Sequence, residues 1–223
     1  VFSVSLSADG RTLASGGFDN TVRLWDAQTG QEQHTLQGHS DVIFSVALSA
    51  EGCTLASGGR DGMVRLWDAR AGRALHILRG HEGLVNSVAL SADGRTLASG
   101  GSDLTVRLWD AQTGRALHTL RGYEGSVNSM ALSTDGRTLA SGCHDGTVRL
   151  WDAQTGLALP ALKGDDESVN SVALSADGRT LASGGRDGTV RLWDTQTGQA
   201  LHTLRGHEGP VNSVTLSADG RTV

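Results

Sequence analysis

Val-Arg-Leu-Trp-Asp, at residues 22–26, is the stretch of this chain that decides its fold. The same five residues return at 64–68, 106–110, 148–152 and 190–194, an unvarying step of 42 residues that places Trp25, Trp67, Trp109, Trp151 and Trp193. A unit this short cannot bury its own apolar surface, so we expect each copy to be stabilised by packing against its neighbours. The sequence therefore predicts one repeat domain over residues 1–223.

One repeat, residues 85–126, reads as four short strands. The predicted strands are Val85–Ser91, Thr96–Gly100, Thr105–Asp110 and Ala116–Leu120, with turn residues about every ten positions and no sustained helical spacing. Asp93-Gly94 supplies a tight hairpin turn. Val106 and Leu108 point to one face while Arg107 and Trp109 point to the other, so both faces of the sheet are expected to be covered. This pattern predicts an all-β fold of four-stranded antiparallel propeller blades.

Several motifs carry a resemblance to the WD-repeat β-propeller family, namely Gly80-His81, Leu97-Ala98-Ser99-Gly100-Gly101, Asp103 and Val106–Asp110. The resemblance covers the whole chain, and the near-identical copies are similar to arrays in bacterial and filamentous-fungal signalling proteins. It implies blades at about 1–42, 43–84, 85–126, 127–168 and 169–210. Residues 211–223 repeat residues 1–13 with three differences and are expected to begin a sixth blade of a longer propeller. An isolated chain of this kind is expected to expose sheet faces and to self-associate.

Serine, histidine and aspartate recur beside the tryptophans and have the residue types of a hydrolase triad. An enzyme needs one such site with an exposed nucleophile, whereas this set recurs with the repeat and the chain has no Gly-x-Ser-x-Gly motif. No catalytic residue is therefore expected, and the resemblance implies a structural hydrogen-bond network instead. Tyr123 and Asp165 replace the histidine in two repeats, and the copy of Trp25 would need a residue preceding Val1, so three of the five networks are expected to be incomplete. The expected network residues are Ser15, Asp19, Trp25, His39, Ser57, Asp61, Trp67, His81, Ser99, Asp103, Trp109, Ser141, Asp145, Trp151, Ser183, Asp187 and Trp193.

Composition and spacing argue against several other kinds of site. His34, His76, His118 and His202 share one repeat position in the outermost strand, and repeat symmetry separates them too widely to hold a metal. Cys53 and Cys143 lack zinc spacing and are expected to be free thiols of a cytoplasmic protein. The net charge of −5, with basic residues spread through the copies, argues against nucleic acid, and no apolar run is long enough for a membrane helix. No cofactor and no metal are expected.

Variation among the copies gathers on one rim of the predicted sheets, where partners of WD-repeat proteins commonly bind. We expect a hot spot at Phe2, Phe18 and Phe44 together with Arg60, because interfaces favour aromatic and arginine side chains. The expected function is a non-catalytic scaffold that binds a protein or peptide in a signalling or regulatory assembly. The alternatives are a purely structural array with an unused rim and an enzyme that works in the central channel. The candidate rim residues are Phe2, Phe18, Phe44, Arg60, Asn86, Ser102, Asn128, His144, Asn170, Arg186 and Asn212.

Overall fold

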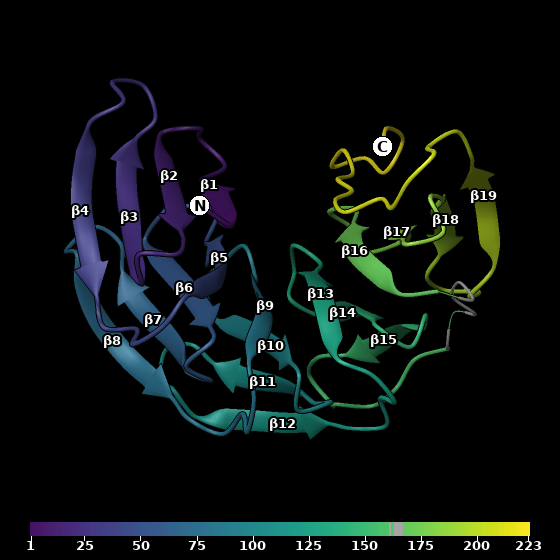
Figure 1. Ribbon diagram of the computed structural model, residues 1–223, viewed down its shortest axis with the longest axis horizontal. Helices are drawn as coiled ribbons and strands as arrows, with labels where there is room; N and C mark the ends of the chain where they lie inside the picture. Colours follow the sequence, from purple (N-terminus) through teal and green to yellow (C-terminus); the bar gives the residue numbers. More distant parts are fainter. Residues whose placement is uncertain (161, 163–166) are drawn as a thin grey trace. The chain divides into compact units, whose positions relative to one another are not determined.

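A computed structural model describes residues 1–160, 162 and 167–223 of the chain (Figure 1). Within these residues every regular element is a β-strand, which confirms the all-β prediction. The chain comprises two compact units, residues 1–119 and 120–223. The closure of the sheets into a propeller and the number of blades stay predictions.

The first unit is built of three antiparallel sheets, each with its strands in chain order. The first sheet contains β1 (Ser3–Leu6), β2 (Thr12–Gly16), β3 (Thr21–Asp26) and β4 (Glu32–Gln37). The second contains β5 (Ile43–Leu48), β6 (Thr54–Gly59), β7 (Val64–Asp68) and β8 (Arg73–Leu78). The third contains β9 (Val85–Leu90), β10 (Thr96–Gly101), β11 (Val106–Asp110) and β12 (Ala116–Leu120), the last of which ends at the unit boundary.

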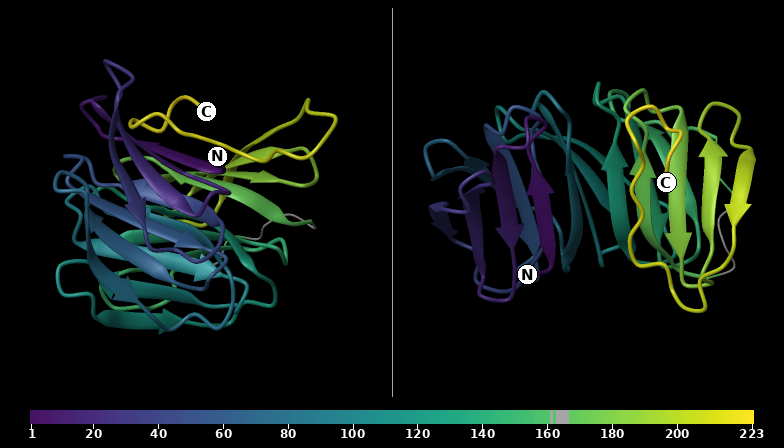
Figure 2. Two further views of the ribbon diagram at one scale, coloured as in Figure 1. Left: turned by 60° about the vertical axis from the view of Figure 1, so that its left-hand side comes forward. Right: turned by 90° about the horizontal axis from the view of Figure 1, so that it is seen from above.

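The second unit holds two further sheets of the same order, and Figure 2 shows neighbouring strands running in alternating directions. The fourth sheet contains β13 (Val127–Leu132), β14 (Thr138–Cys143) and β15 (Val148–Asp152). The fifth contains β16 (Val169–Leu174), β17 (Thr180–Gly185), β18 (Val190–Asp194) and β19 (Ala200–Leu204).

Two segments depart from the predicted four-strand pattern. Among the described residues the fourth sheet has three strands, and the isolated bridges Val148–Leu162 and Trp151–Ala158 lie along its outer edge. Residues 211–223, expected to begin a sixth blade, contain no β-strand. They nevertheless occupy the place of a first strand, because the backbone N–H of Val214 donates to the Ser171 hydroxyl at 3.1 Å. A first strand without a second strand beside it has no ladder to join.

Each hairpin turn is held by its own side chains, as the third sheet illustrates. The Ser91 hydroxyl donates to Asp93 Oδ1 at 2.6 Å, and the backbone N–H of Arg95 donates to the same oxygen at 3.0 Å. Gly94 has a φ of 69°, a conformation that glycine adopts without steric cost. After β11, Asp110 accepts the N–H groups of Gln112 and Thr113, which explains why aspartate follows tryptophan in each repeat.

The faces of neighbouring sheets pack together through the alternating positions of the repeat. Val22 and Leu24 lie in one buried cluster with Ile43 of β5 and Trp67 of β7. The opposite face of β7 presents Val64 and Leu66 to a second cluster, which the third sheet completes with residues such as Val85 and Trp109. The second sheet is therefore covered on both faces, as the alternation in its third strand predicts.

The innermost strands of neighbouring sheets are joined by serine hydroxyls. Val46 N–H donates to Ser3 Oγ at 3.1 Å and Leu48 N–H donates to Ser5 Oγ at 3.0 Å. The same link joins Val88 to Ser45 at 3.0 Å in the first unit and Val172 to Ser129 at 3.1 Å in the second. A small hydroxyl side chain thus lets two first strands approach closely while it satisfies a backbone donor.

We expect Gly58→Ala to destabilise the first unit, because the glycine lies directly against the next sheet. A Cβ at Gly58 would lie 2.5 Å from Val85 Cγ1 and 3.0 Å from Val88 Cγ1. Overpacking of this kind lowers the free energy of unfolding by about 1 to 3 kcal/mol. Gly209→Ala is the control, since a Cβ there meets no atom within 4 Å. Urea unfolding followed by tryptophan fluorescence measures both variants, and equal stabilities would contradict the packing described.

Candidate functional site

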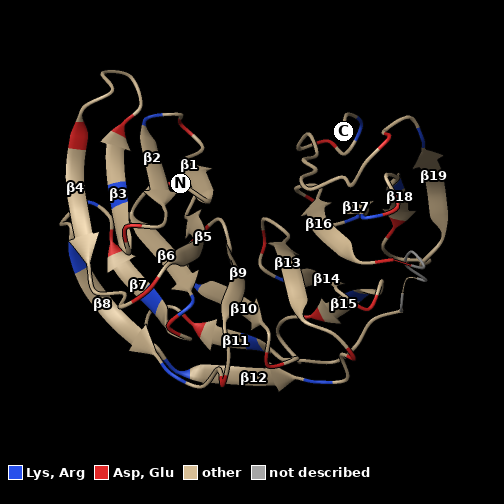
Figure 3. Cartoon of the chain, viewed as in Figure 1, with Lys and Arg blue, Asp and Glu red and all other residues tan. Residues whose placement is uncertain are grey.

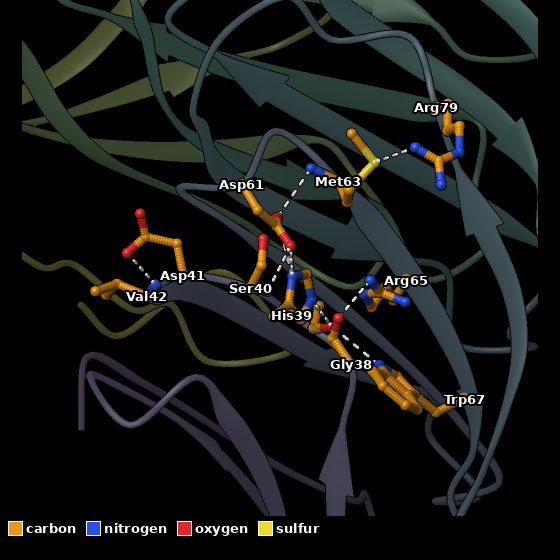
Figure 4. Close-up of polar contacts among 11 residues, drawn as sticks. Gly38, His39, Ser40, Asp41, Val42, Asp61, Met63, Arg65, Trp67 and Arg79 are labelled. Carbon is orange, nitrogen blue, oxygen red and sulfur yellow. Dashed lines mark hydrogen bonds and ion pairs between the residues drawn. The ribbon is translucent and has the colours of Figure 1, made fainter.

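A buried network joins two loops to the body of the second sheet (Figure 4). Trp67 Nε1 donates to Ser57 Oγ at 2.9 Å, and Ser57 Oγ lies 2.8 Å from His39 Nε2. His39 Nδ1 lies 2.9 Å from Asp61 Oδ2. Asp61 also accepts the backbone N–H groups of Ser40 and Met63. The network therefore fixes the loop before β5 and the turn between β6 and β7 relative to β7.

The third sheet repeats this arrangement with nearly the same distances. Trp109 Nε1 donates to Ser99 Oγ at 2.8 Å, Ser99 Oγ lies 2.8 Å from His81 Nε2, and His81 Nδ1 lies 2.9 Å from Asp103 Oδ2. Thr105 adds a hydroxyl hydrogen bond of 2.8 Å to Asp103 Oδ1. These two sheets bring together the full sets of predicted network residues.

Burial and hydrogen bonding set the charge of the network. Burial holds the pKa of His81 below its ordinary value, against the pull of the Asp103 carboxylate. Burial alone would raise the pKa of Asp103, but the positive charge that His81 takes up in acid and hydrogen bonds from Thr105, His81 and the Glu82 N–H lower it below its ordinary value. A neutral histidine therefore donates from Nδ1 to a charged carboxylate and accepts the serine proton at Nε2.

This hydrogen-bond order is that of a hydrolase triad, yet the serine has no access to a substrate. Ser57 and Ser99 are completely buried. Each serine oxygen also accepts an indole N–H, which occupies a lone pair that a nucleophile needs. The arrangement stabilises the two loops and offers no exposed nucleophile.

In the fourth sheet Tyr123 replaces the histidine and connects the hydrogen-bond network in a different order. Trp151 Nε1 donates to the Tyr123 hydroxyl at 2.7 Å, and that hydroxyl lies 2.8 Å from Ser141 Oγ. Ser141 Oγ donates in turn to the Arg149 carbonyl at 3.3 Å, so the tyrosine must donate to the serine. The Arg149 guanidinium lies 5.1 Å from the centre of the Tyr123 ring, within range of a cation–π interaction. The sequence identified the substitution but not the insertion of tyrosine between Trp151 and Ser141.

The first and fifth sheets keep the tryptophan bond, with Trp25 to Ser15 and Trp193 to Ser183 both at 2.9 Å. The turn aspartates have other partners there. Asp19 lies 3.3 Å from Arg23, and Asp187 lies 3.4 Å from Arg191. Asp165, the replacement for histidine in the fifth repeat, lies outside the described residues. In the fourth sheet Asp145 accepts from the Glu124 N–H and from Thr147.

The outer-strand histidines of the first unit contact the neighbouring sheet. His34 Nε2 lies 3.1 Å from the Arg70 carbonyl, and His76 Nε2 lies 3.0 Å from the Gln112 carbonyl. Each ring therefore carries its proton on Nε2 and donates to the turn that precedes the next outer strand. The pattern within one repeat could not predict these contacts, because each joins residues 36 positions apart. Among the described residues no three metal-binding side chains converge.

Two of the three aromatic residues predicted for the rim contact each other. The rings of Phe2 and Phe44 form an edge-to-face pair with centroids 6.0 Å apart and an interplanar angle of 76°. Phe18 is exposed on the turn after β2. Arg60 Nε lies 3.8 Å from Asp41 Oδ2, and both side chains are largely exposed.

The asparagines at the candidate rim of the second unit link neighbouring first strands. Asn128 Nδ2 donates to Ser168 Oγ at 3.1 Å and to the Val169 carbonyl at 3.0 Å. Asn170 Nδ2 donates to the Val211 carbonyl at 3.3 Å and to Asn212 Oδ1 at 3.4 Å. These amides already have partners within the chain. Their proposed role in partner binding stays a prediction, as does that of Asn86.

Each unit has a shallow hollow at the same place on this rim. The first hollow, of about 330 Å³, is bounded by residues that include Arg60, Glu82, Leu84 and Ser102. The second, of about 360 Å³, lies between His144, Glu167, Ser168 and Arg186. Residues 60, 84 and 102 correspond to 144, 168 and 186 two repeats later. The two hollows therefore lie at equivalent places on the rim, whereas the side chains around them differ.

Leu104 lies on the same rim and has an unusual backbone conformation. Its φ is 61°, in the left-handed region, whereas the equivalent positions in three other repeats are Gly62, Gly146 and Gly188. This conformation is sterically unfavourable for leucine. Its side chain is exposed and apolar, which adds a hydrophobic group to the rim of the third sheet.

The family model described as "WD domain, G-beta repeat" matches residues 1–26, 30–68, 72–110, 114–152, 158–194 and 198–223, which is most of the chain. The chain belongs to the WD-repeat family. Residues 30–68 of one match contain β4 of the first sheet and β5, β6 and β7 of the second. One WD repeat thus spans two sheets, and members of the family generally act as protein-interaction scaffolds rather than enzymes.

Curated relatives match over single repeats. "Dynein assembly factor with WD repeat domains 1" of Mus musculus is 39% identical over 41 residues, 18% of this chain and 10% of the relative. The Homo sapiens protein of that name has the same identity and coverage. "Coronin-7" of Mus musculus is 58% identical over 38 residues, 17% of this chain and 4% of the relative. The aligned stretch spans a tenth or less of each of these relatives.

We expect Ser99→Ala to cost more stability than Ser15→Ala. The first variant leaves Trp109 Nε1 and His81 Nε2 buried without their partner, at about 1 to 3 kcal/mol for each group. Ser15 accepts from Trp25, which is only half-buried, so we expect that variant to cost less than about 1 kcal/mol. Urea unfolding measures the difference, and equal losses would show that the complete network adds nothing.

We expect acid to destabilise the third WD repeat through His81. Because its folded pKa is depressed, the unfolded chain takes up a proton first as the pH falls through about 6.5. The contribution of His81 to the free energy of unfolding is therefore fully present above about pH 7.5. It is lost on acidification, by up to about 1.4 kcal/mol per pH unit. The lowered pKa of Asp103 acts in the same direction below about pH 4.

His81→Tyr is the matched variant, since the fourth repeat carries Tyr123 at this position. Tyrosine does not titrate between pH 7.5 and 5, so the free energy of unfolding should decline less over this range in the variant. Urea unfolding at several pH values measures the slope. The same decline in both proteins would rule out His81 as its source.

Proposed function

We propose that this WD-repeat protein is a non-catalytic scaffold that binds a protein or peptide at the rim of its first unit, as part of a signalling or regulatory assembly. The observation that carries the proposal is the aromatic pair of the exposed Phe2 and the half-buried Phe44, on the same rim as Arg60. Aromatic and arginine side chains are enriched in protein interfaces. A partner is expected to place an apolar side chain against the two phenylalanine rings.

The hollow between the second and third sheets lies on the same rim and has polar side chains around it. Arg60 and Glu82 lie at the hollow with opposite charges, and Leu84 adds an apolar contact. An extended peptide could therefore set a polar side chain in the hollow and an apolar one on Phe44. The strained, exposed Leu104 supports a use for the rim, because such backbone strain gathers at functional sites.

Charge supports a protein partner over nucleic acid. Acidic and basic residues are interspersed along the chain, and the net charge is −5 (Figure 3). A nucleic-acid surface requires a basic face that neutralises phosphates. Within the described part of the chain no helix could cross a lipid bilayer. We also propose a cytoplasmic location, which the two free thiols Cys53 and Cys143 support.

The test uses a peptide selected from a random display library on the full chain. We expect Phe44→Asn combined with Arg60→His to weaken binding of that peptide at least tenfold, measured by fluorescence anisotropy. Asn128 and His144 occupy these two positions in the fourth repeat, so the replacements suit the fold. Arg95→Ala, on the turn between β9 and β10, is the control and should leave the affinity unchanged. Equal affinity of the double variant would refute the rim proposal.

A further inference from the structure

The outer strand of the second sheet, β8, has an edge that is free for another chain. Strand β8 ends this sheet, and no strand of the described residues pairs with its outer side. The second sheet is packed on both faces by its neighbours, so the edge belongs to a sheet that is otherwise complete. An edge strand presents backbone N–H and C=O groups to solvent and is a place where extended segments dock.

Two aliphatic side chains are exposed on β8. Leu75 is 41% exposed and Ile77 is 45% exposed. His76, between them, turns to the third sheet and donates to the Gln112 carbonyl. The second sheet thus anchors this strand through His76 and leaves two large apolar groups in solvent, where they gain nothing from the fold.

Three exposed arginines flank these side chains, namely Arg70 and Arg73 before them and Arg79 after them. No aspartate or glutamate occurs between Asp68 and Glu82. Arg73 Nε lies 3.8 Å from Asp68 Oδ2, but the arginine side chain is 71% exposed, and such a surface ion pair is weak. Arg79 Nη1 contacts the uncharged Met63 sulfur at 3.5 Å. The edge of β8 is therefore apolar in the middle and basic at both ends.

The first sheet shows that an outer strand does not need these residues. The same five positions in and beside β4 are all polar and uncharged, and they hold Gln28, Gln31, Gln33, Thr35 and Gln37. The position of Ile77 is a threonine in the third and fifth sheets as well, at Thr119 and Thr203. Since β4, β12 and β19 form with these polar residues, the aliphatic and basic side chains of β8 are not required for the strand.

We propose that the edge of β8 is a second interaction surface, which binds an extended acidic segment of another protein. Arg73 and Arg79 are six positions apart, which is about 20 Å along a strand. Two carboxylates at a similar spacing would lie against the two arginines. Apolar side chains between the carboxylates would cover Leu75 and Ile77. This surface lies on β8 rather than on the turns of the rim, so it goes beyond the function proposed above.

Charge argues against a second copy of this chain as the occupant. If two β8 strands paired antiparallel about His76, Arg73 of each copy would lie opposite Arg79 of the other. Like charges directly opposite each other destabilise a strand pair. The same arginines attract an acidic segment, and they therefore select the partner as well as strengthen its binding.

The test begins with a random nine-residue display library selected on the full chain. The library is first depleted on a variant in which β8 carries the residues of the first sheet, with Arg73→Gln, Leu75→Gln, Ile77→Thr and Arg79→Gln. We expect the enriched peptides to carry two acidic residues about six positions apart with apolar residues between them. Failure of enrichment, or enrichment of neutral or basic peptides, would overturn the proposal.

The affinity of the most enriched peptide is then measured by fluorescence anisotropy. We expect Leu75→Gln with Ile77→Thr to weaken binding at least fivefold, and Arg73→Gln with Arg79→Gln to do the same and to remove most of the salt dependence. No loss of affinity in either pair would overturn the proposal. Urea unfolding should give both pairs the stability of the unmodified chain, because the first sheet folds with these residues.

Two controls assign the binding to β8. Arg115→Gln with Leu117→Gln makes the same kind of change on β12 and should leave the affinity unchanged, whereas an equal loss would overturn the assignment. Phe44→Asn with Arg60→His should also leave it unchanged, so this proposal and that of the rim can fail separately. In sedimentation velocity, a dimer of the unmodified chain that the β8 variants abolish would identify a second copy as the occupant and overturn the acidic partner.

Discussion

A buried indole N–H must find an acceptor, and this requirement organises every repeat of the chain. The tryptophan of the third strand supplies a large apolar surface for the neighbouring sheet, but its nitrogen has to be satisfied inside the protein. In four sheets the acceptor is the serine of the second strand, at 2.8 to 2.9 Å. That bond fixes the two central strands relative to each other. In the second and third sheets histidine and aspartate extend it to the loops of the rim.

The network separates the residues that hold the rim from those that can vary on it. Asp61 and Asp103 have their carboxylates turned inward, where they accept histidine and backbone donors. Arg60, the residue before Asp61, projects from the same turn but takes no part in the network. Ser102, the residue before Asp103, instead accepts the Leu84 N–H at 2.8 Å and so helps to hold the loop before β9. A change at Arg60 therefore alters the chemistry of the rim without removing a hydrogen bond of the network, and the two hollows, at equivalent places, have different linings.

The sequence was sufficient to predict much of this structure because the relevant signals are local. The tryptophan step, the Asp-Gly turns and the alternation of Val106 and Arg107 predicted strands that the structure places within a residue or two. The composition of the network was also predicted, although the assignment of roles depended on the family resemblance. Each of these features lies within a single repeat, where spacing along the chain determines spacing in space.

Features that depend on contacts between repeats could not be predicted in the same way. The insertion of Tyr123 between Trp151 and Ser141 depends on the space around a side chain that is larger than histidine. The hydrogen bonds of the Asn128 side-chain amide and of the His34 ring join residues about 40 positions apart. Residues 211–223 nearly repeat residues 1–13, yet they carry no β-strand in the described chain, and no local propensity in this stretch reports that difference.

The serine links between first strands have a consequence for how such a chain can change in length. Each link joins a hydroxyl to a backbone N–H 43 residues further on, and it recurs from repeat to repeat. Since the donor is the backbone, the link makes no demand on the side chain of the next repeat. Duplication or loss of one 42-residue unit would restore the same hydrogen bond at the new junction. The gene can therefore gain or lose whole repeats while every remaining boundary between sheets keeps its chemistry.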